Sequence, residues 1–323
     1  MAKYGSTDGN REGRLLSDTI TYLDRASVRQ LLPPLTEQLD LIEDTYVAMA
    51  RGRVEVPPKP GIHPRPDSFI NAMPAYLADR DVAAIKWVSA YPGNRRNGLP
   101  SISGLIILND PVSGVPEVVM DAAEITAVRT AVASGVSIRH LAHEGWTKVA
   151  ILGYGEQGRQ HARVVQALNP GAQITVYGGP RLHAPQDGVD VVGDAHSAVD
   201  GAELVITTGP MSKDPDPVIV RDWLPTSCLV VPVDYDASVT PPTVEEADLF
   251  VVDDVGQYDQ YRSQGQFRGW PNAHTSIGDA LQTPPAGDLR VVCSLGVGAL
   301  DAAFGAAIHE RARAAGLGLA LPR

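Results

Sequence analysis

The sequence has little of what marks secreted proteins. It holds two cysteines in 323 residues, Cys228 and Cys293, and each lies in an apolar run typical of a buried strand. We therefore expect two packing residues and no disulfide bridge. Residues 1–18 are polar and lack the apolar stretch of a signal peptide. These absences predict a cytoplasmic protein.

Long apolar runs and an excess of positive charge are also missing. The longest apolar region, residues 291–308, is interrupted by Ser294, Asp301 and several glycines, so we expect no membrane span. The net charge is −11, whereas binding to nucleic acid or an anionic membrane needs clustered lysine and arginine. The eight histidines form no metal-ligand pattern, and we predict no metal site. A small metabolite is the expected ligand.

What the sequence does contain is a dinucleotide-binding fingerprint near its midpoint. Gly153, Gly155 and Gly158 have the G-x-G-x-x-G spacing, after a strand-like run at 148–152 and before a helical pattern at 159–168. This is the context that the motif requires. The glycines would permit a tight turn, the approach of a pyrophosphate and close packing of helix on strand. The pyrophosphate would lie at the helix N-terminus. The alternative is a purely structural turn.

The chain before the fingerprint predicts a tail, helices and a sheet. Residues 1–17 are rich in Gly, Ser, Asp and Arg, which is typical of a disordered tail. Apolar residues at helical spacing predict a helix over 27–50, followed by a proline-rich connector at 56–66. Four strands are expected at 69–76, 82–89, 104–109 and 115–120. Successive strands without intervening helices indicate an antiparallel or mixed sheet.

The rest of the chain predicts a different architecture. A helix is expected over 121–141, with Asp121 as its N-cap and Glu124 in capping-box position. From residue 149 to about 293, strands and helices alternate, which indicates a parallel, doubly wound sheet. A final helix at 295–315 would return to the first part. The predicted fold class is α/β, a Rossmann-type parallel sheet joined to an α+β unit.

Three ionisable residues stand where their neighbours are apolar. Lys86 lies in the run 82–88, and Arg129 lies inside the predicted helix. Together they would hold a substrate carboxylate, Arg129 in a two-pronged pairing and Lys86 as a point charge that also donates a proton. Asp234 follows an apolar strand, and ligands of doubly wound sheets bind outside such strand ends. The structural alternatives are a lysine that reaches solvent, an arginine that pairs with carbonyls or acids nearby, and an aspartate that caps a turn.

These residues belong to a longer series that resembles a known family. The series begins with Met73-Pro74 and covers most of the chain. It includes the fingerprint, which contains Gln157, and two later aspartates, Asp234 and Asp253. Its other segments are 86–94, 98–100, 108–110, 114–116, 120–121, 126–130 and 294–296. The ordered series is similar to the ornithine cyclodeaminase and μ-crystallin family and is far more specific than the glycine motif alone.

The resemblance implies a homodimer whose subunits have two domains. Residues 18–143 and 296–323 would form a substrate and dimerisation domain, around a dinucleotide-binding Rossmann domain of residues 144–295. It also implies a nicotinamide cofactor, NAD or NADP, and an oxidoreductase of an α-amino or α-imino acid, as an imine reductase or amino-acid dehydrogenase. One alternative is an ornithine or lysine cyclodeaminase, which releases ammonia without net cofactor turnover. Another is a non-catalytic, μ-crystallin-like protein that binds NAD(P)H or another ligand.

The resemblance also assigns roles by position. Lys86 and Arg129 would bind the α-carboxylate, with Ser101 beside them and Lys59 as a further cation. Asp234 would exchange a proton with the reacting nitrogen, and Lys86 is the second catalytic candidate. The residues expected at the cofactor are Gly153, Gly155, Glu156, Gln157, Gly158, Thr130, Arg181 and Ser294.

Two departures from the family pattern bear on specificity. Asn71 stands where ornithine cyclodeaminases have a glutamate, which favours imine reduction or amino-acid dehydrogenation over cyclisation. No acidic residue follows the strand expected at 174–177 to bind the ribose hydroxyls, and Arg181 would instead meet a 2′-phosphate. The choice between NAD and NADP therefore stays open. The short distance to the next strand, at 191–192, predicts a short or missing helix there.

Overall fold

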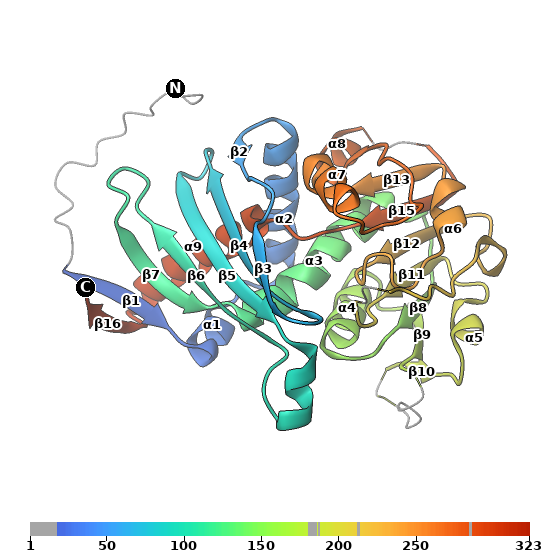
Figure 1. Cartoon of the computed structure of the whole chain (residues 1–323), viewed down its shortest axis with the longest axis horizontal. Helices are drawn as coiled ribbons and strands as arrows, with labels where there is room; N and C mark the ends of the chain where they lie inside the picture. Colours follow the sequence, from blue (N-terminus) through green and yellow to red (C-terminus); the bar gives the residue numbers. More distant parts are fainter. Residues whose placement is uncertain (1–17, 180–185, 187, 212–213, 284–285) are drawn as a thin grey trace.

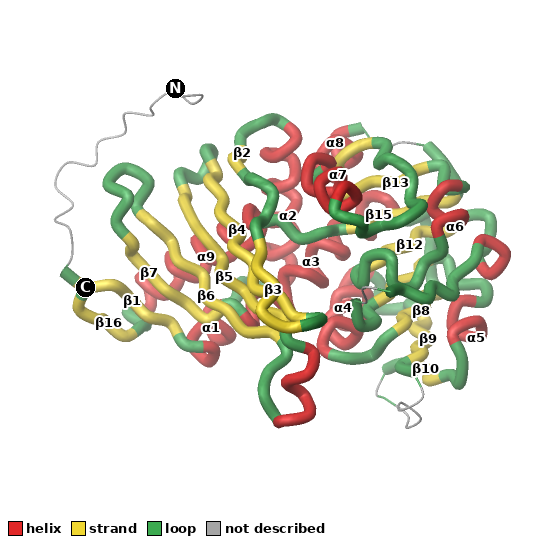
Figure 2. Tube along the Cα trace, in the orientation of Figure 1, coloured by secondary structure: helices red, strands yellow, loops and turns green. Residues whose placement is uncertain are grey.

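The computed structural model describes residues 18–179, 186, 188–211, 214–283 and 286–323. The tail expected at residues 1–17 and the candidate Arg181 lie outside the described residues. Two eight-stranded sheets form the molecule. They lie side by side in Figure 1, and Figure 2 shows their strands as two separate groups with helices between them. The predicted combination of an α+β unit with a Rossmann-type parallel sheet is confirmed.

The first sheet is mixed and draws strands from both ends of the chain. Its order is β16 (Leu319–Pro322), β1 (Thr19–Leu23), β7 (Pro116–Asp121), β6 (Ile102–Asn109), β5 (Val82–Ala90), β4 (Ser68–Leu77) and β2 (Val54–Glu55), with β3 (Gly61–Arg65) paired to β4. β1 pairs with β7 in parallel, and the other pairings are antiparallel. The four strands predicted between residues 69 and 120 all belong to it.

Helices cover one face of the first sheet. Successive residues of a strand point to opposite faces, so Lys86 of β5 shares a face with its cross-strand partners Met73 and Ile106. The helix α9 (Gly298–Ala315) packs on this face along β4, β5 and β6, behind the sheet in Figure 1. The approach is close, because a Cβ on Gly298 would lie 2.6 Å from the carbonyl oxygen of Met73. The predicted return of the last helix is therefore confirmed.

Residues 27–50 form two helices, and the prediction of a single helix is wrong. The two are α1 (Arg25–Leu31) and α2 (Leu35–Ala50). Pro33 and Pro34 stand between them, and a proline disfavours helical backbone in the residue before it. The chain therefore leaves the first helix at Leu31 and starts a new one after Pro34.

The expected capping box of the next helix does not form. This helix, α3, runs from Ala123 to Leu141, and the carboxylate of Asp121 accepts a hydrogen bond from the N–H of Ala123 at 2.9 Å. Glu124 instead binds Arg25 and Arg29 of α1, at 3.2 and 2.8 Å. Two arginines within reach outcompete the backbone N–H for this carboxylate.

The second sheet is parallel throughout. Its order is β10 (Asp190–Val191), β9 (Gln173–Tyr177), β8 (Lys148–Leu152), β11 (Leu204–Thr207), β12 (Cys228–Pro232), β15 (Leu289–Cys293), β13 (Leu249–Val252) and β14 (Thr275–Ser276). Its strands alternate with α4 (Glu156–Leu168), α5 (Ala195–Val199), α6 (Pro241–Glu245), α7 (Val255–Ser263) and α8 (Ile277–Gln282); short 3-10 helices lie at Pro92–Asn97 and Arg221–Trp223. The chain goes from β8 to β9 on one side and to β11 on the other. Ligands of such sheets bind at this reversal of strand order.

Three further features concern the connection after β9, the two cysteines and the apolar character of the helices. The described residues between β9 and β10 include no helix. Cys228 and Cys293 are buried and unpaired. None of the helices in the described ranges combines the length and the apolar character needed to cross a membrane.

Candidate active site

Five strands of the second sheet end in residues of the candidate site. Gly153, Asp253 and Ser294 come directly after β8, β13 and β15. One residue separates Gly209 from the end of β11, and one separates Asp234 from the end of β12. Because the strands are parallel, their carboxyl ends lie at one edge of the sheet. The fingerprint and the predicted acid–base residue thus share this edge.

The three fingerprint glycines have distinct surroundings. Gly153 has a φ of +91°, and a Cβ there would lie 2.7 Å from the backbone of Thr208. A Cβ on Gly158 would lie 2.2 Å from the carbonyl oxygen of Gly153. At Gly155, in contrast, a Cβ would meet no atom of the described residues within 4 Å. Two glycines therefore permit the turn to pack, while the third borders open space.

The N-terminus of α4 fits an anionic ligand at that open space. No side chain of the described residues caps it, so its first N–H groups and the helix dipole face the space beside Gly155. The buried atoms Gln157 Oε1 and Thr126 Oγ1 have no hydrogen-bond partner among the described residues. Gln157 Nε2 donates to the carbonyl of Ala127 at 3.4 Å, and Thr130 donates to that of Thr126 at 2.7 Å. Gln157 Oε1 only accepts hydrogen bonds, so the first N–H groups of α4 and the Thr126 hydroxyl are the donors that a dinucleotide pyrophosphate would use.

Lys86 and Arg129 meet at a residue that sequence reasoning did not select. Lys86 Nζ lies 2.7 Å from Asp301 Oδ2, and Arg129 Nε donates to Asp301 Oδ1 at 3.1 Å. Lys86 and Asp301 are each 1% exposed, and Arg129 is also buried. We name these three residues, from β5, α3 and α9, the buried triad. Beyond this ion pair with Asp301, Lys86 Nζ has no hydrogen-bond partner among the described residues, so lysine hydrogens remain for a ligand.

Burial and charge set the protonation of the triad. Burial and the neighbouring Arg129 lower the pKa of Lys86 to about 7, although Asp301 opposes this shift. Burial alone would raise the pKa of Asp301, but Arg129 and Lys86 outweigh it and hold the pKa below its usual value. The triad therefore contains an ionised carboxylate, a permanent guanidinium and an amine that titrates near neutrality.

Lys59 lies close to this group but binds backbone carbonyls. Its Nζ donates to the carbonyl of Leu295 at 2.6 Å, to that of Gly296 at 3.2 Å and to Tyr235 Oη at 3.5 Å. The ammonium also lies 5.3 Å from the centre of the Tyr261 ring. Burial lowers its pKa to about 8. The three hydrogens of Lys59 are thus directed at protein acceptors.

The turn after β15 connects Lys59 to the triad. Asp253 accepts hydrogen bonds from the N–H groups of Leu295 and Gly296, at 3.0 and 2.6 Å. Gly296 has a φ of +79°, and a Cβ there would lie 3.2 Å from Nη1 of Arg129. The glycine therefore leaves room for the terminal nitrogens of Arg129, while Asp253 binds the N–H groups of the turn and Lys59 binds its carbonyl groups.

Asp234 is buried and held by three donors. Thr207 Oγ1 donates to Oδ1 at 2.5 Å, and Gly209 N and Ser238 Oγ donate to Oδ2 at 2.8 and 2.7 Å. Burial raises the pKa of Asp234, and these hydrogen bonds only partly offset that rise. A carboxyl group whose pKa is raised towards neutrality is suited to exchange protons.

No contact with the triad is described for the remaining candidates. Ser101 precedes β6, and its carbonyl accepts a hydrogen bond from Tyr91 at 2.8 Å. Ser294 Oγ lies 3.5 Å from the hydroxyl of the buried Tyr46. The side chain of Glu156, at the start of α4, is exposed. Among the described residues, no group of three or more histidines, cysteines or acids is placed to hold a metal ion.

Asp301 is the main residue that sequence reasoning missed. In the sequence, Asp301 interrupts an apolar stretch and belongs to no recognisable motif. The signal that points to it is its position, because Ala299, Leu300, Ala302 and Ala303 around it are all fully buried. A carboxylate in such a helix needs a partner, and the two buried cations of the sequence are natural ones.

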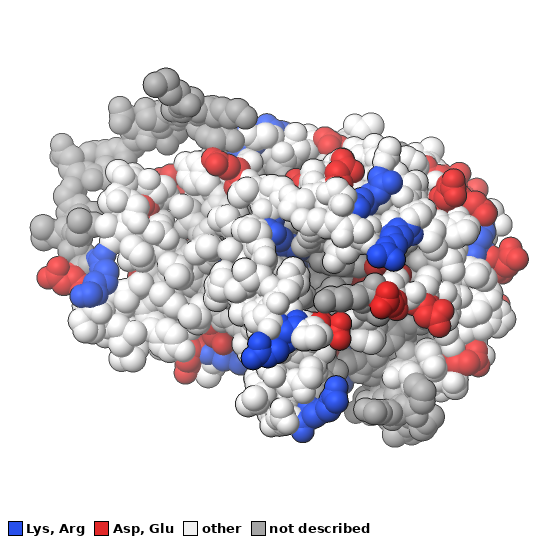
Figure 3. All heavy atoms as spheres, in the orientation of Figure 1, with Lys and Arg blue, Asp and Glu red and all other residues white. Residues whose placement is uncertain are grey.

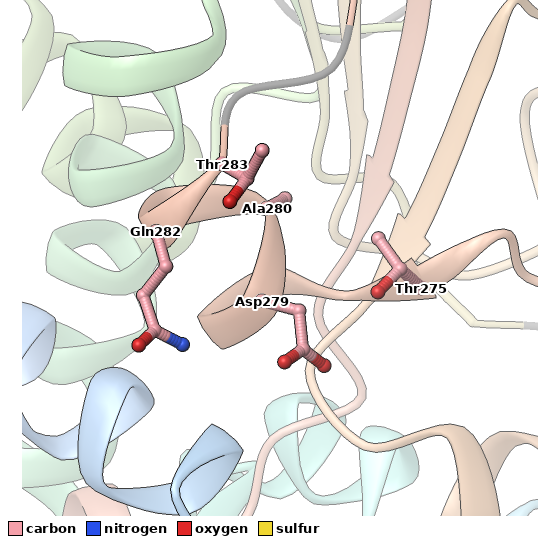
Figure 4. A pocket seen from close by; sticks show the side chains of 5 residues that line it. All are labelled: Thr275, Asp279, Ala280, Gln282 and Thr283. Atoms are coloured by element: carbon pink, nitrogen blue, oxygen red, sulfur yellow. The ribbon is translucent and has the colours of Figure 1, made fainter.

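The pocket in Figure 4 is separate from this site. Its volume is about 440 Å³, and it is lined by Thr275, Asp279, Ala280, Gln282 and Thr283 around α8. None of these residues belongs to the triad, to the fingerprint or to the turn after β15.

Comparison with known proteins gives the chain its family. Residues 21–275 match the ornithine cyclodeaminase/mu-crystallin family. The nodulation efficiency protein NfeD of Rhizobium meliloti is 33% identical over 314 residues, which is 93% of this chain and 97% of that protein. The alanine dehydrogenase of Archaeoglobus fulgidus is 26% identical over 310 residues, 88% of this chain and 92% of that protein.

A solved structure shares the fold over nearly the whole chain. It is the Delta(1)-pyrroline-2-carboxylate reductase of Thermococcus litoralis in complex with NADH and L-proline, at 25% identity and a TM-score of 0.80. The match covers 93% of this chain and 99% of that one. The chain therefore belongs to the ornithine cyclodeaminase/mu-crystallin family.

Proposed function

We propose that the protein is an NAD(P)-dependent oxidoreductase of an α-amino or α-imino acid. In the oxidative direction, the amino acid loses a hydride from its α-carbon and a proton from its nitrogen, giving the imino acid, reduced cofactor and a proton. The reverse reaction reduces the imine. Relatives named as an alanine dehydrogenase and a Delta(1)-pyrroline-2-carboxylate reductase support both directions.

The buried triad is the observation that carries the proposal. With all three groups ionised, two cations face one carboxylate, so the triad has one positive charge in excess. Burial makes an uncompensated charge costly, and a single carboxylate neutralises it. We assign the binding of that carboxylate to the terminal nitrogens of Arg129 and the remaining hydrogens of Lys86, which is supported by the space at Gly296 beside Arg129. An α-amino or α-imino acid supplies one.

The other residues of the site then have consistent roles. A bound nicotinamide accepts or donates the hydride. Asp234 exchanges the proton of the substrate nitrogen, and its raised pKa suits that task. Lys86 holds the α-carboxylate and is a second proton carrier, because its pKa of about 7 lets it change charge near neutrality. We assign Lys59 to the support of the turn after β15, since its hydrogens are directed at carbonyls and a tyrosine.

The cofactor in this proposal is NAD or NADP. The open space at Gly155 and the N-terminus of α4 would take the pyrophosphate, with Thr130 and Gln157 beside it. The residues that would contact the ribose include Arg181, which lies outside the described residues. The choice between the two cofactors therefore rests with the assay below.

We further propose that the active protein is a homodimer formed by the outer face of the first sheet. On this face Trp87 is 47% exposed and pairs across strands with Leu105, which is 40% exposed. Ile85 and Ile107 pair beside them on the same face. Figure 3 shows few charged atoms over these strands. A contiguous apolar surface of this kind is a common sign of an interface.

The domain division and the location complete the proposal. Residues 18–143 and 296–323 would form the substrate and dimerisation domain, and residues 144–295 the Rossmann domain. This division is supported by which strands belong to each of the two sheets and by the packing of α9 on the first sheet.

We propose a cytoplasmic location, because both cysteines are unpaired, as a reducing compartment favours.

A single assay panel tests the proposed function. The purified protein is incubated with NAD⁺ or NADP⁺ and L-alanine, L-proline, L-ornithine or L-lysine, and reduced cofactor and ammonia are followed together. Cyclic imines with NADH or NADPH test the reverse direction. Net change of the cofactor is the expected result. Ammonia from ornithine or lysine without net reduced cofactor indicates a cyclodeaminase, and no reaction in any arm contradicts the proposal.

A further inference from the structure

We propose that Asp301 is a positioning residue, whose carboxylate fixes Lys86 and Arg129 as a pair and favours the charged form of Lys86 that binds the substrate carboxylate. This inference rests on the proposed function and adds to it the residue that prepares the anion site. Asp301 acts through the two cations and need not touch the substrate.

The geometry of the triad shows how one carboxylate serves two cations. Each oxygen of Asp301 faces one partner: Oδ2 lies 2.7 Å from Lys86 Nζ, and Oδ1 accepts from Arg129 Nε at 3.1 Å. Binding through Nε leaves Nη1 and Nη2 of Arg129 beside Gly296. The arrangement thus sets the separation of the two cations while keeping the two-pronged edge of the guanidinium for another anion.

A purely stabilising role accounts poorly for Asp301. Ala299, Leu300, Ala302 and Ala303, its neighbours in α9, are fully buried, so an apolar residue at position 301 would continue the packing surface. Buried ion pairs seldom gain more stability than well-packed apolar residues, because each charge loses its hydration. Here three charged groups are buried together instead of one pair. Such an arrangement is typical of a site that prepares for a charged ligand.

Among the charged groups around Lys86, Asp301 is the one that favours the protonated amine. The groups that influence Lys86 most are Asp301 on α9, Arg129 on α3 and Lys59 in the connector before β3. Of these three, only Asp301 is negative. Without it, burial and two cations would all favour the neutral amine, so the pKa of Lys86 would fall further below its ordinary value.

The decisive measurement is the pKa of Lys86 in the full-length protein without substrate. The chain has five lysines, so NMR of protein labelled with ¹³Cε-lysine gives few signals, and Lys86→Arg and Lys59→Arg assign two of them. Asp301→Asn keeps the shape and removes the charge. We expect it to lower the pKa of Lys86 by about one pH unit or more, a tenfold change in the protonation equilibrium. An unmoved pKa overturns the proposal.

A matched control separates this effect from the general loss of a buried carboxylate. Asp253→Asn removes another buried aspartate of the same region, whose charge raises the pKa of Lys59. It should shift the signal of Lys59 and leave that of Lys86 within about 0.3 pH units, well under the one-unit effect expected for Asp301→Asn. An equal shift of Lys86 in both variants shows that burial, and not Asp301 in particular, governs Lys86, and this also overturns the proposal.

A second variant tests position apart from charge. Asp301→Glu keeps the charge but moves the carboxylate by one methylene, so the pKa of Lys86 should stay near that of the wild type. With L-alanine and L-proline as probes, KM should rise about tenfold or more while kcat changes less, as expected when a bound group is misplaced. A wild-type KM overturns the positioning role, even if Asp301→Asn does not fold. Absence of turnover by the wild-type protein contradicts the proposed function alone, because the NMR experiment needs no substrate.

Discussion

The carboxylate of Asp234 accepts a hydrogen bond from the backbone N–H of Gly209 at 2.8 Å, which joins the residues that follow β12 and β11. This contact holds the proposed proton carrier at the same edge of the sheet as the fingerprint glycines. It also explains why Gly209 is small, since a Cβ there would lie 2.9 Å from Asp234 Oδ2.

The first prediction concerns Asp234 itself. Asp234→Asn should lower kcat by about 10²- to 10⁴-fold, because the amide cannot carry the proton of the substrate nitrogen. Steady-state kinetics measures the loss, and circular dichroism verifies the fold. Ser238→Ala is the control, since it removes one donor to Asp234 and leaves the carboxylate in place. Full turnover by Asp234→Asn contradicts the assignment.

The second prediction concerns Arg129 of α3. Arg129→Lys should raise KM about tenfold to a hundredfold, because a lysine makes no two-pronged contact with a carboxylate and charged hydrogen bonds contribute about 1.5–3 kcal/mol. Arg139→Lys on the same helix is the matched control, because Arg139 pairs with Asp40 and Glu43 at the surface. If both variants have the wild-type KM, Arg129 does not bind the substrate carboxylate.

The third prediction contrasts two glycines of one motif. Gly155→Ala should leave the thermal midpoint nearly unchanged and weaken binding of NAD(H) or NADP(H), because its Cβ enters the open space proposed for the pyrophosphate. Gly158→Ala should lower the midpoint by several degrees, since its Cβ would lie 2.2 Å from the carbonyl oxygen of Gly153. Differential scanning fluorimetry with and without cofactor reports both effects. Unchanged cofactor affinity in Gly155→Ala would show that the cofactor does not bind at this turn.

The fourth prediction is a pH dependence of stability that arises from His161. Its Nδ1 donates to the carbonyl of Gln157 at 2.8 Å, and Nε2 lies 2.9 Å from the hydroxyl of Ser134. Burial lowers the pKa of His161 from 6.5 to about 4. The unfolded chain therefore binds the proton more readily, so this contribution is present above pH 6.5 and is lost as the pH falls towards 4.

The size of this effect follows from the two pKa values. Between about pH 7.5 and about pH 4.5, protonation of His161 should cost about 2 to 3 kcal/mol of unfolding free energy. Urea denaturation of the wild type and of His161→Gln measures it, because the variant lacks this part of the pH dependence. Parallel pH profiles for the two proteins would show that His161 is not the group responsible.

The fifth prediction concerns the outer face of the first sheet. Trp87→Asp should convert the proposed dimer into monomers, because a carboxylate in an apolar interface is left without a partner. Val112→Asp is the control: Val112 is 81% exposed and lies in the turn between β6 and β7. Analytical ultracentrifugation distinguishes the two. A wild-type protein that sediments as a monomer, or a Trp87→Asp variant that stays dimeric, argues against this interface.

The sequence predicted the parts of the site that depend on neighbouring residues. The fingerprint turn lies between a strand and a helix that adjoin it in the sequence, and a Cβ on Gly158 would meet Gly153, only five positions away. Lys86 and Arg129 stand out because a cation in an apolar run is unusual wherever the run folds. The two helices at residues 25–50 were also within reach, since Pro33 and Pro34 mark the break.

The contacts that join distant residues were not predictable in this way. Arg129 and Asp301 are separated by 172 positions, and Lys59 and Leu295 by 236. No periodicity or spacing encodes such a pairing. Glu124 illustrates the same limit, because its local pattern favoured a capping box while two arginines from α1 gave it stronger partners.

Because α9 lies near the end of the chain, it joins the first sheet late during synthesis. The strands β8 to β15 and the cations Lys86 and Arg129 are all made before Gly298. The first sheet receives its covering helix and the strand β16 last, and the triad receives its only carboxylate with them. A nascent chain that stops short of residue 298 would thus contain the residues of the fingerprint turn. Its cations Lys86 and Arg129 would still lack their counter-ion, Asp301.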